Sequence, residues 1–547
     1  MSQASPTFLH IDLSNQKSEV VSYEELIPRV GGLGWALSLF EKFYNQDAGE
    51  EGLPIIFALG PLSAVFPGVS RVVAVFRSPQ TLGLATSLGG GQLARFLRFA
   101  GYQGLVITGK ASSPTFVGVD DGQIDFKDSS HLKGLPTPKV FERIHLMEGA
   151  PSKRSVVATG PATEAGFGFS PLYIDEFFSF ARDGLGSAFF AKNLKGLAVS
   201  GSKSEDIANP RRYGEVFREL IKRSSGFKEL SAFGTLKNIA VEKKISGVPF
   251  KNLAEVGLPT DELLPKSFQD EMPDKKISSA SCPVGDVRVF KWEKRYVPYD
   301  FESVVSLGPL LGLVEPSSVA RLIVKAYDLG FDPTSLGVIL AYLTEEEKLN
   351  FGDLDSYETL IDALYFAREN WSKDLKQGAP QKDNSLTLGG IEFLPYFNGY
   401  ASLASQILRL GATTEENRGY ILDLDLLEGE VNVDQAVSLM VSAEEKKTLS
   451  ELLVGNGHLA SVFEDPAVSF AALDALGYSF KHEFLVKEAA EVFRQKLSLQ
   501  KLLGFNPLSV RIPRRFFEVP SPQGFLKEEK LKGIVEVYKN EVFETAG

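Results

Sequence analysis

The sequence predicts an α+β protein in which a duplicated β-sheet domain is followed by two mainly helical domains. Short β-branched and aromatic runs, separated by glycine and proline, occupy the first part of the chain. After about residue 205 the apolar residues instead recur three and four positions apart, as they do in helices. Two segments of the first part also occur twice, which indicates related halves. The 547 residues are enough for three or four such domains.

Residues 1–203 form the predicted sheet domain. β-branched and aromatic residues favour strands, and the glycine and proline between them favour turns. Five runs have this composition: Pro54-Ile-Ile-Phe-Ala-Leu, Arg71-Val-Val-Ala-Val-Phe, Gly104-Leu-Val-Ile-Thr, Thr115-Phe-Val-Gly-Val and Ser155-Val-Val-Ala-Thr. We expect each of them to be a strand.

Two segments of this domain repeat in the same order. Phe57-Ala-Leu-Gly-Pro-Leu-Ser recurs as Val157-Ala-Thr-Gly-Pro-Ala-Thr, and Gly104-Leu-Val-Ile-Thr-Gly-Lys-Ala-Ser recurs as Gly196-Leu-Ala-Val-Ser-Gly-Ser-Lys-Ser. A single match of this length arises easily by chance, but two in the same order are less common. The repeat therefore predicts two half-sheets with the same succession of strand, glycine-rich helix start and strand.

The rest of the chain is predicted to be mainly helical. Three of its segments show the helical spacing clearly: Pro316–Tyr327, Ala436–Val441 and Glu483–Leu503. Between them, Asp374–Leu388 is polar and contains Pro380, which is typical of a loop. We place a domain boundary there and expect one helical domain at residues 204–390 and another at residues 391–547.

Composition excludes several classes of protein. The net charge of −12 disfavours a nucleic acid as the main partner, because phosphate backbones are repelled by an acidic surface. A single cysteine rules out a disulfide framework and a cysteine-rich metal site, and the five histidines form no His-x-x-x-His pair. No signal peptide and no apolar run of membrane-spanning length is present. We expect a cytoplasmic protein that is not in a membrane.

One glycine cluster in each half opens a predicted helix. The first contains Gly90 and Gly91, and the second contains Arg182 and Gly184. Glycine lets the backbone approach a ligand closely, and free N–H groups at a helix start attract phosphate. Taken one at a time, each cluster is more typical of a tight turn between strand and helix. Neither matches a phosphate-binding loop or a dinucleotide-binding motif.

Three charged residues are further candidates for ligand binding. Arg71 begins a predicted strand, where a guanidinium either clamps a phosphate with two hydrogen bonds or is simply exposed. Asp332 ends Asp328-Leu-Gly-Phe-Asp, and Asp474 begins the related segment Asp474-Ala-Leu-Gly-Tyr-Ser. A carboxylate inside a cavity can accept two N–H donors of a heterocycle such as a pterin. For Asp332 the following Pro333 equally predicts a helix N-cap.

Taken in order, several segments resemble the aldehyde ferredoxin oxidoreductase family of tungsten- and molybdenum-pterin enzymes along essentially the whole chain. They are Gly31-Gly-Leu-Gly, Leu59-Gly-Pro-Leu, Pro67-Gly-Val-Ser-Arg, Phe99-Ala-Gly-Tyr-Gln-Gly, Lys192-Asn-Leu-Lys, Phe301-Glu-Ser-Val-Val-Ser-Leu-Gly and Pro513-Arg-Arg-Phe-Phe-Glu-Val-Pro-Ser-Pro-Gln-Gly. The resemblance implies a base of two related sheets, two helical domains, and a metal held between two pterins at their junction.

The resemblance also assigns residues to this cofactor. It implies that Arg71 and the backbone near Gly90, Gly91, Arg182 and Gly184 lie against the pterin phosphates. It implies further that the two carboxylates that hydrogen-bond the pterins are Asp332 and Asp474. This hypothesis requires the two aspartates to lie near each other and the glycine clusters to be open to a ligand.

The departures from the family pattern concern its iron–sulfur cluster. Family members hold a four-iron cluster with a Cys-x-x-Cys-x-x-x-Cys run and a distant cysteine that ends an Asp-x-x-Gly-Leu-Cys motif. Those four places are here Ser279, Cys282, Asp286 and Ser479. One thiolate with three oxygen ligands is a poor iron–sulfur site, so a 4Fe-4S cluster is not expected. Cys282 is otherwise typical of a small buried apolar residue.

A second departure concerns proton transfer. The family has a histidine near the metal after an Asn-Arg-Gly motif, whereas Asn417-Arg-Gly is followed here by Tyr420. Asp300 and Glu302 are the candidate catalytic residues that could carry a proton instead, although ordinary solvated or helix-capping carboxylates have the same appearance in a sequence.

The resulting hypothesis is an enzyme that oxidises an aldehyde to a carboxylate at a tungsten or molybdenum bis-pterin centre without its own cluster. Its expected partners are a small aldehyde and an electron-carrier protein or partner subunit, and the family resemblance is compatible with a homodimer. The alternative is a non-catalytic paralogue that serves as a subunit or scaffold. A nucleotide-dependent transferase that uses the glycine clusters is a third, weaker option.

Overall fold

The computed structural model describes residues 5–49, 52–149, 151–204, 207–285, 287–427 and 431–546. Two six-stranded sheets make up its N-terminal part. The first contains β1 (Thr7–Asp12), β2 (Lys17–Ser22), β3 (Ile55–Ala58), β4 (Val72–Arg77), β5 (Leu84–Gly89) and β6 (Gly104–Thr108). The second contains β7 (Thr115–Asp120), β8 (Gln123–Asp128), β9 (Ser155–Thr159), β10 (Leu172–Ile174), β11 (Phe178–Phe180) and β12 (Leu194–Ser200). All five predicted strands are present.

The two sheets have the same topology, which confirms the predicted duplication. The first runs β2-β1-β6-β3-β4-β5 and the second runs β8-β7-β12-β9-β10-β11. In each sheet the first two strands along the chain form an antiparallel hairpin. The first strand of that hairpin also pairs in parallel with the last strand of the sheet along the chain, β6 or β12. That last strand pairs antiparallel with the third strand, β3 or β9. The repeated glycines match as well, because Gly104 pairs with Ala58 and Gly196 pairs with Ala158.

Three hydrophobic cores organise these sheets into layers. One core takes side chains from both sheets and from α2 (Leu93–Ala100) and α5 (Leu185–Ala191). Alternate residues of β3 point to the opposite face, where they pack with α1 (Gly32–Phe43). The second sheet packs on its other face with α3 (Thr137–Glu148) and the central helices. The short helix α4 (Pro161–Glu164) follows β9.

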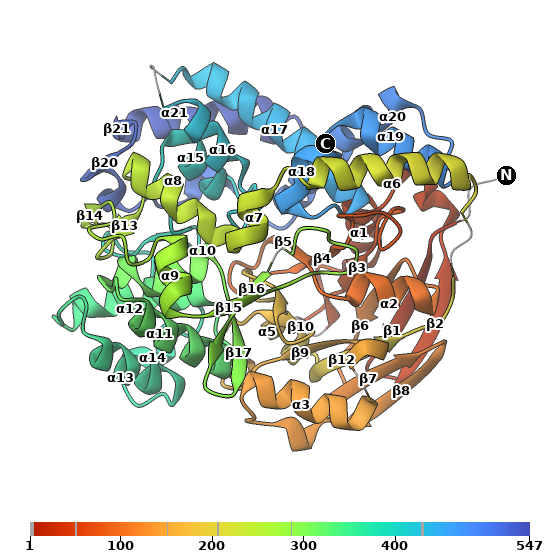
Figure 1. Cartoon of the computed structure of the whole chain (residues 1–547), viewed down its shortest axis with the longest axis horizontal. Helices are drawn as coiled ribbons and strands as arrows, with labels where there is room; N and C mark the ends of the chain where they lie inside the picture. Colours follow the sequence, from red (N-terminus) through yellow and green to blue (C-terminus); the bar gives the residue numbers. More distant parts are fainter. Residues whose placement is uncertain are drawn as a thin grey trace.

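Two groups of helices cover the sheets, as Figure 1 shows with the green helices on one side and the blue helices on another. The first group contains α6 (Pro210–Ser224), α7 (Lys228–Phe233), α8 (Asn238–Ile245), α9 (Pro265–Glu271), α10 (Phe301–Leu307), α11 (Pro316–Leu329), α12 (Pro333–Glu346), α13 (Leu354–Tyr365) and α14 (Trp371–Asp374). The second contains α15 (Tyr400–Ile407), α16 (Arg418–Asp425), α17 (Val433–Leu453), α18 (Ala460–Phe463), α19 (Pro466–Ala475), α20 (His482–Leu502) and α21 (Glu528–Tyr538). The predicted change to helical structure is therefore confirmed, whereas the boundaries at residues 203 and 390 stay predictions.

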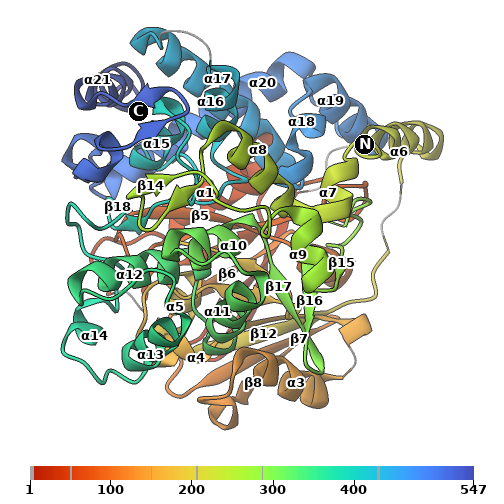
Figure 2. The same cartoon turned by 60° about the vertical axis from the view of Figure 1, so that its left-hand side comes forward.

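The helical part also contains strands that the sequence analysis did not predict. An antiparallel sheet of β15 (Asp274–Ile277), β16 (Val287–Trp292) and β17 (Arg295–Tyr299) lies to the right of α10 and α11 in Figure 2. Its strands are largely half-exposed and carry many charges, so they lack the apolar runs that identified the other strands. Short hairpins are formed by β13 (Pro249–Phe250) with β14 (Glu255–Val256), β18 (Thr387–Leu388) with β19 (Ile391–Glu392), and β20 (Pro520–Ser521) with β21 (Gly524–Phe525).

Within the described ranges, no single helix has the length and apolar composition needed to cross a membrane. One bent pair, Phe301–Leu311 with Pro316–Leu329, meets that test jointly, by length and composition only. Most residues of both helices are buried in the protein.

The duplicated glycines generate a stability prediction. A Cβ at Gly104 would lie 2.0 Å from Phe57 O, and one at Gly196 would lie 2.3 Å from Val157 O. Backbone atoms cannot move away from the new Cβ as the end of a flexible side chain can. We therefore expect Gly104→Ala and Gly196→Ala each to lower the free energy of unfolding by about 2 kcal/mol. Chemical denaturation followed by circular dichroism measures this.

The matched control is Gly214→Ala in the middle of α6, where the nearest atom to the new Cβ is the Arg218 side-chain tip at 3.6 Å. Alanine should stabilise that helix by about 0.5–1 kcal/mol. Equal effects at all three positions would contradict the close approach of the paired strands.

Candidate functional site

A cavity of about 490 Å³ is bounded by β5, β10 and β11 on one side and by α8, α10, α11 and α16 on the others. Cavities of this size hold small organic ligands. Much of the wall is aromatic or aliphatic, and a group of titratable side chains interrupts it. These are Arg71, Lys237, Arg288, Asp300, Glu302, Asp332, Glu415, Glu416, Arg418 and His458.

Asp300 and Glu302 form an acidic pair at the start of α10. Asp300 is the N-cap residue: its carboxylate accepts a hydrogen bond from Ser303 N at 2.7 Å, and Ser303 Oγ accepts one from Asp300 N at 2.9 Å. Glu302 accepts a hydrogen bond from Thr414 N at 2.6 Å. The structure thus brings the two predicted catalytic residues together on the cavity wall.

Burial changes the acidity of this pair. Burial and, to a smaller extent, the negative charge of Asp300 raise the pKa of Glu302 to about 7, although the hydrogen bonds with Thr414 act to lower it. Burial also raises the pKa of Asp300, although the Ser303 hydrogen bonds lower it. Because two neighbouring carboxylates resist double ionisation, the pair can hold one proton near neutral pH.

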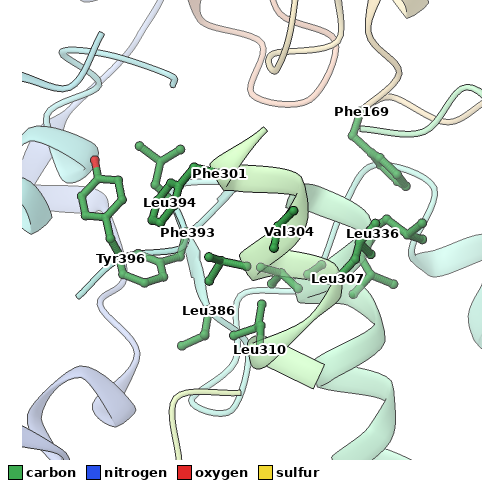
Figure 3. Close-up of a cluster of buried hydrophobic side chains, with 14 of the residues drawn as sticks. Phe169, Phe301, Val304, Leu307, Leu310, Leu336, Leu386, Phe393, Leu394 and Tyr396 are labelled. Carbon is green, nitrogen blue, oxygen red and sulfur yellow. The ribbon is translucent and has the colours of Figure 1, made fainter. Parts of the chain in front are cut away.

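Hydrophobic packing fixes the helix that carries this pair. Figure 3 shows Phe301, Val304 and Leu307 of α10 within a buried cluster that includes Leu336 of α12. At the helix start, Phe301 N donates a hydrogen bond to Thr235 Oγ1 at 3.0 Å. The position of the acidic pair is therefore set by the core on one side of α10 and by the Thr235 segment at its N-terminus.

Asp332 is buried at the start of α12 and meets Arg182 of the sheet domain. It caps the helix by accepting a hydrogen bond from Ser335 N at 2.8 Å, and the same oxygen lies 3.4 Å from Arg182 Nη1. Arg182 Nη2 also donates to the carbonyl of Glu392. Asp332 is therefore a helix cap and a cavity-wall residue together, as the sequence analysis allowed.

Arg71 contacts acidic protein side chains rather than standing exposed at a strand end. Its Nη2 lies 3.2 Å from Glu415 Oε2, and His458 Nε2 lies 3.1 Å from the same oxygen. The arginine is buried and lies on the cavity wall. His458 was not among the predicted site residues, since a single histidine far from every recognised motif carries no sequence signal.

The predicted glycine cradles are packed against the protein itself. A Cβ at Gly90 would lie 2.4 Å from Arg71 Nη1, and one at Gly91 would lie 2.7 Å from Asp175 Oδ2. At Gly184 a Cβ would lie 1.9 Å from the carbonyl oxygen of Gly168. None of these three glycines lies on the cavity wall within the part of the chain that the structure describes. Their small size serves close packing at the base of the cavity.

Asp474 lies apart from the other predicted ligands. Its side chain is 54% exposed at the end of α19, lies 3.9 Å from Arg212 on α6, and is absent from the cavity wall. Ser479, five residues later, is exposed as well. The structure does not bring Asp474 together with Asp332, and we do not carry it forward as a ligand residue.

A different segment faces the cysteine. Asn456 Nδ2 lies 3.7 Å from Cys282 Sγ, so the segment opposite the Cys282 loop is Glu451–Asn456. The spacing from Glu451 to Asn456 equals that from Asp474 to Ser479, so spacing alone does not distinguish the two segments. Cys282 otherwise packs in a small apolar cluster with Leu230, Val284 and Leu459.

Two further predicted cluster positions are Ser279 and Asp286. Ser279 is buried and accepts a hydrogen bond from Gly91 N at 3.2 Å. Asp286 lies outside the described residues. Within the described ranges, no group of three or more His, Cys, Asp or Glu side chains is arranged to hold a metal ion.

Behind the cavity wall lies a buried group of charges that the sequence analysis missed. It contains Glu416, Glu444, Lys447, Glu451 and Lys496. Lys447 Nζ contacts Glu444 at 2.5 Å, and burial raises the pKa of Glu416 to about 7, an effect that the charge of Glu451 increases. The signal was available, because Glu444, Lys447 and Glu451 fall on one face of α17.

Two family models match this chain. Residues 8–201 match the N-terminal domain of aldehyde ferredoxin oxidoreductase, and residues 212–379 match its domains 2 and 3. The chain belongs to the aldehyde ferredoxin oxidoreductase family. The two matched regions correspond to the duplicated sheets and to the helices around the cavity.

Curated relatives support the same membership. The chain is 24% identical to the tungsten-containing aldehyde ferredoxin oxidoreductase of Pyrococcus furiosus, over 94% of this chain and 92% of that protein. It is 25% identical to the WOR-like subunit of an aliphatic sulfonate oxidoreductase of the same organism, over 68% of this chain and 65% of that protein. These relatives show that members of the family contain tungsten and occur as subunits.

A solved structure shares the fold of this chain. It is the active site complex BamBC of benzoyl coenzyme A reductase with 1,5 dienoyl-CoA, with a TM-score of 0.82 and 18% identity over 98% of this chain and 95% of that chain. At this identity the likeness establishes the arrangement of the domains and no particular substrate.

The Arg182–Asp332 pair generates a second prediction. We expect Asp332→Asn to lower the free energy of unfolding by about 3 kcal/mol, since the asparagine can still cap α12 but leaves a buried guanidinium without its anion. Asp353→Asn is the control, because Asp353 caps α13 through the same kind of bond to Ser356 in an exposed position. Denaturation curves that shift equally for both variants would show that the ion pair contributes nothing of its own.

The acidic pair generates a third prediction, about pH. The native pKa of Glu302, about 7, exceeds its ordinary value of 4.5, so between those values the folded chain holds more protons than the unfolded chain. The free energy of unfolding should therefore fall as pH rises from about 4.5 to 7 and then level off, by on the order of 1 kcal/mol per pH unit relative to Glu302→Gln. Thermal or urea denaturation across this range measures it, and parallel curves for the two proteins would contradict it.

Proposed function

We propose that this protein oxidises a small aldehyde to a carboxylate at a pterin-bound tungsten or molybdenum in the central cavity. The observation that carries the proposal is the proton-holding pair of Asp300 and Glu302 on the wall of that cavity. Oxidation of an aldehyde to a carboxylate consumes one water and releases two electrons and three protons. A carboxylate with a pKa near 7 is suited to take up such a proton at neutral pH.

The two conditions set by the sequence analysis are not met, because Asp474 is not on the cavity wall and Gly90, Gly91 and Gly184 pack against protein atoms. A pterin in the cavity would be held by the remaining wall residues. Asp332 supplies a carboxylate acceptor for heterocyclic N–H groups, and Arg71 and Arg418 supply cationic donors. Arg418 Nε is buried and has no hydrogen-bond acceptor in the described part of the chain, which is expected of a wall that faces a polar ligand. When bound, the metal and its pterin would supply the two-electron transfer.

The chain's own residues have distinct roles in this proposal. Glu302 takes up or returns a proton at the carboxylate oxygen that is not held by Thr414 N, and Asp300 keeps its pKa high. His458, hydrogen-bonded to Glu415, is a second proton carrier on the same wall. The aromatic part of the wall binds the body of the aldehyde and excludes water from it.

We propose that this chain has no iron–sulfur cluster of its own. Cys282 packs with Leu230, Val284 and Leu459 and lies 3.7 Å from Asn456 Nδ2, and in the described residues no group of three or more His, Cys, Asp or Glu side chains could hold a metal ion. The electrons therefore need another acceptor, and we propose a soluble carrier or a partner subunit for this role.

A second candidate function is a non-catalytic subunit or scaffold. The close packing of Gly90, Gly91 and Gly184 favours it, because the predicted cradles have no space left for phosphate groups beside these three residues. In that case the cavity would have no catalytic role, and the protein would act by binding other proteins.

Metal analysis with an activity assay separates the two candidates. After expression in a host that makes the pterin cofactor, we expect about one tungsten or molybdenum per chain, iron far below cluster stoichiometry, and aldehyde-dependent reduction of a dye. Glu302→Gln should keep the metal and lower kcat about 100-fold. Glu528→Gln on the exposed start of α21 is the control with unchanged kcat. Absence of both metal and activity in the wild type would support the scaffold.

A further inference from the structure

The cations on the cavity wall differ in whether the protein neutralises them. Arg71 and His458 contact Glu415, Arg288 forms two hydrogen bonds with Asp274, and Arg418 contacts Glu464, each at 3.2 Å or less. Lys237 is the exception within the described part of the chain. Its Nζ donates to the amide oxygen of the adjacent Asn238 at 3.0 Å and forms no ion pair.

The position of Lys237 relative to the acidic pair is fixed by a hydrogen bond. Lys237 ends the short 3-10 helix Gly234–Lys237, and Thr235 in that helix accepts the hydrogen bond from Phe301 N at 3.0 Å. Phe301 lies between Asp300 and Glu302 in the sequence. A ligand can therefore reach the ammonium with one end and the acidic pair with the other end without leaving the cavity.

The surface around these polar groups is apolar and largely aromatic. Phe177, Phe178, Tyr299, Tyr327 and Phe331 line the same cavity. Such walls bind a flat or branched hydrocarbon body by burial and by aromatic contacts. A small sugar or a bare inorganic anion would leave this surface without a partner.

We propose that Lys237 is a specificity-determining residue that binds a carboxylate on the substrate, so that the substrate is an aromatic or branched aldehyde with an anionic group at its far end. The inference rests on the proposed function and names the substrate class of the same site. Burial lowers the pKa of the Lys237 ammonium, and the charge of Glu229 raises it; a bound carboxylate would favour the charged form further.

Ligand binding to the protein as isolated tests this without any need for turnover. The probes are benzoate and its neutral analogue benzamide, measured by calorimetry. Wild type should bind benzoate better than benzamide. Lys237→Met, which keeps the apolar stem, should weaken benzoate binding at least tenfold and leave benzamide binding within about twofold.

Two control variants sharpen the result. Lys237→Arg should restore most of the benzoate affinity, because it restores the positive charge. Lys244→Met removes an exposed lysine of α8 that is not on the cavity wall, and it should change nothing. Equal loss for both methionine variants, or no loss in either, would overturn the proposal.

Inorganic phosphate as a third probe tests whether the lysine recognises a phosphate instead. Phosphate that competes with benzoate at similar concentration and depends equally on Lys237 would overturn the carboxylate assignment. Failure of the inference and failure of the proposed function have different signatures. The first gives a metal-containing, active protein with Lys237-independent benzoate binding, and the second gives Lys237-dependent binding in a protein without metal.

Discussion

One ion pair joins all three parts of this chain. Arg182 follows β11 of the second sheet, Asp332 caps α12 in the central helical region, and the carbonyl that Arg182 also contacts belongs to Glu392 in the later part. All three residues are buried. Because an isolated guanidinium or carboxylate is costly to bury, the three parts can only come together with these groups in register. The cavity wall beside Asp332 follows from that constraint.

The parts of the fold that could be predicted are those whose side chains are apolar on both faces. Strands such as Ile55–Ala58 are buried throughout, so their composition identifies them, and the glycines at 104 and 196 mark the duplication because both meet a neighbouring strand. The sheet of β15, β16 and β17 escaped prediction since its strands are charged and half-exposed. Hydrophobic periodicity indicates which residues are buried, and it gives no signal for a strand that is only partly buried.

Sequence could point to a site residue where the signal lies within a few residues of it in the chain. Asp332, Asp300 and Glu302 stand at helix starts, where sequence and geometry are tightly linked, and all three lie on the cavity wall. Asp474 was selected on a spacing. The structure places its side chain, 54% exposed, near Arg212, whereas Asn456 of the equally spaced segment Glu451–Asn456 lies near Cys282. His458 and Lys237 could not be found, since only the tertiary fold brings them to the cavity. Long-range proximity is the information that one sequence lacks.

The carboxylates on the cavity wall differ in whether a cation is paired with them. Glu415 serves both Arg71 and His458, whereas Asp300 and Glu302 share a site with no cation bonded to either carboxylate in the described residues. Like charges so close together are relieved either by a retained proton or by an approaching donor. A Glu302 carboxyl with a pKa of about 7 lets this wall exchange protons near neutral pH, so its acidic pair is suited to proton transfer.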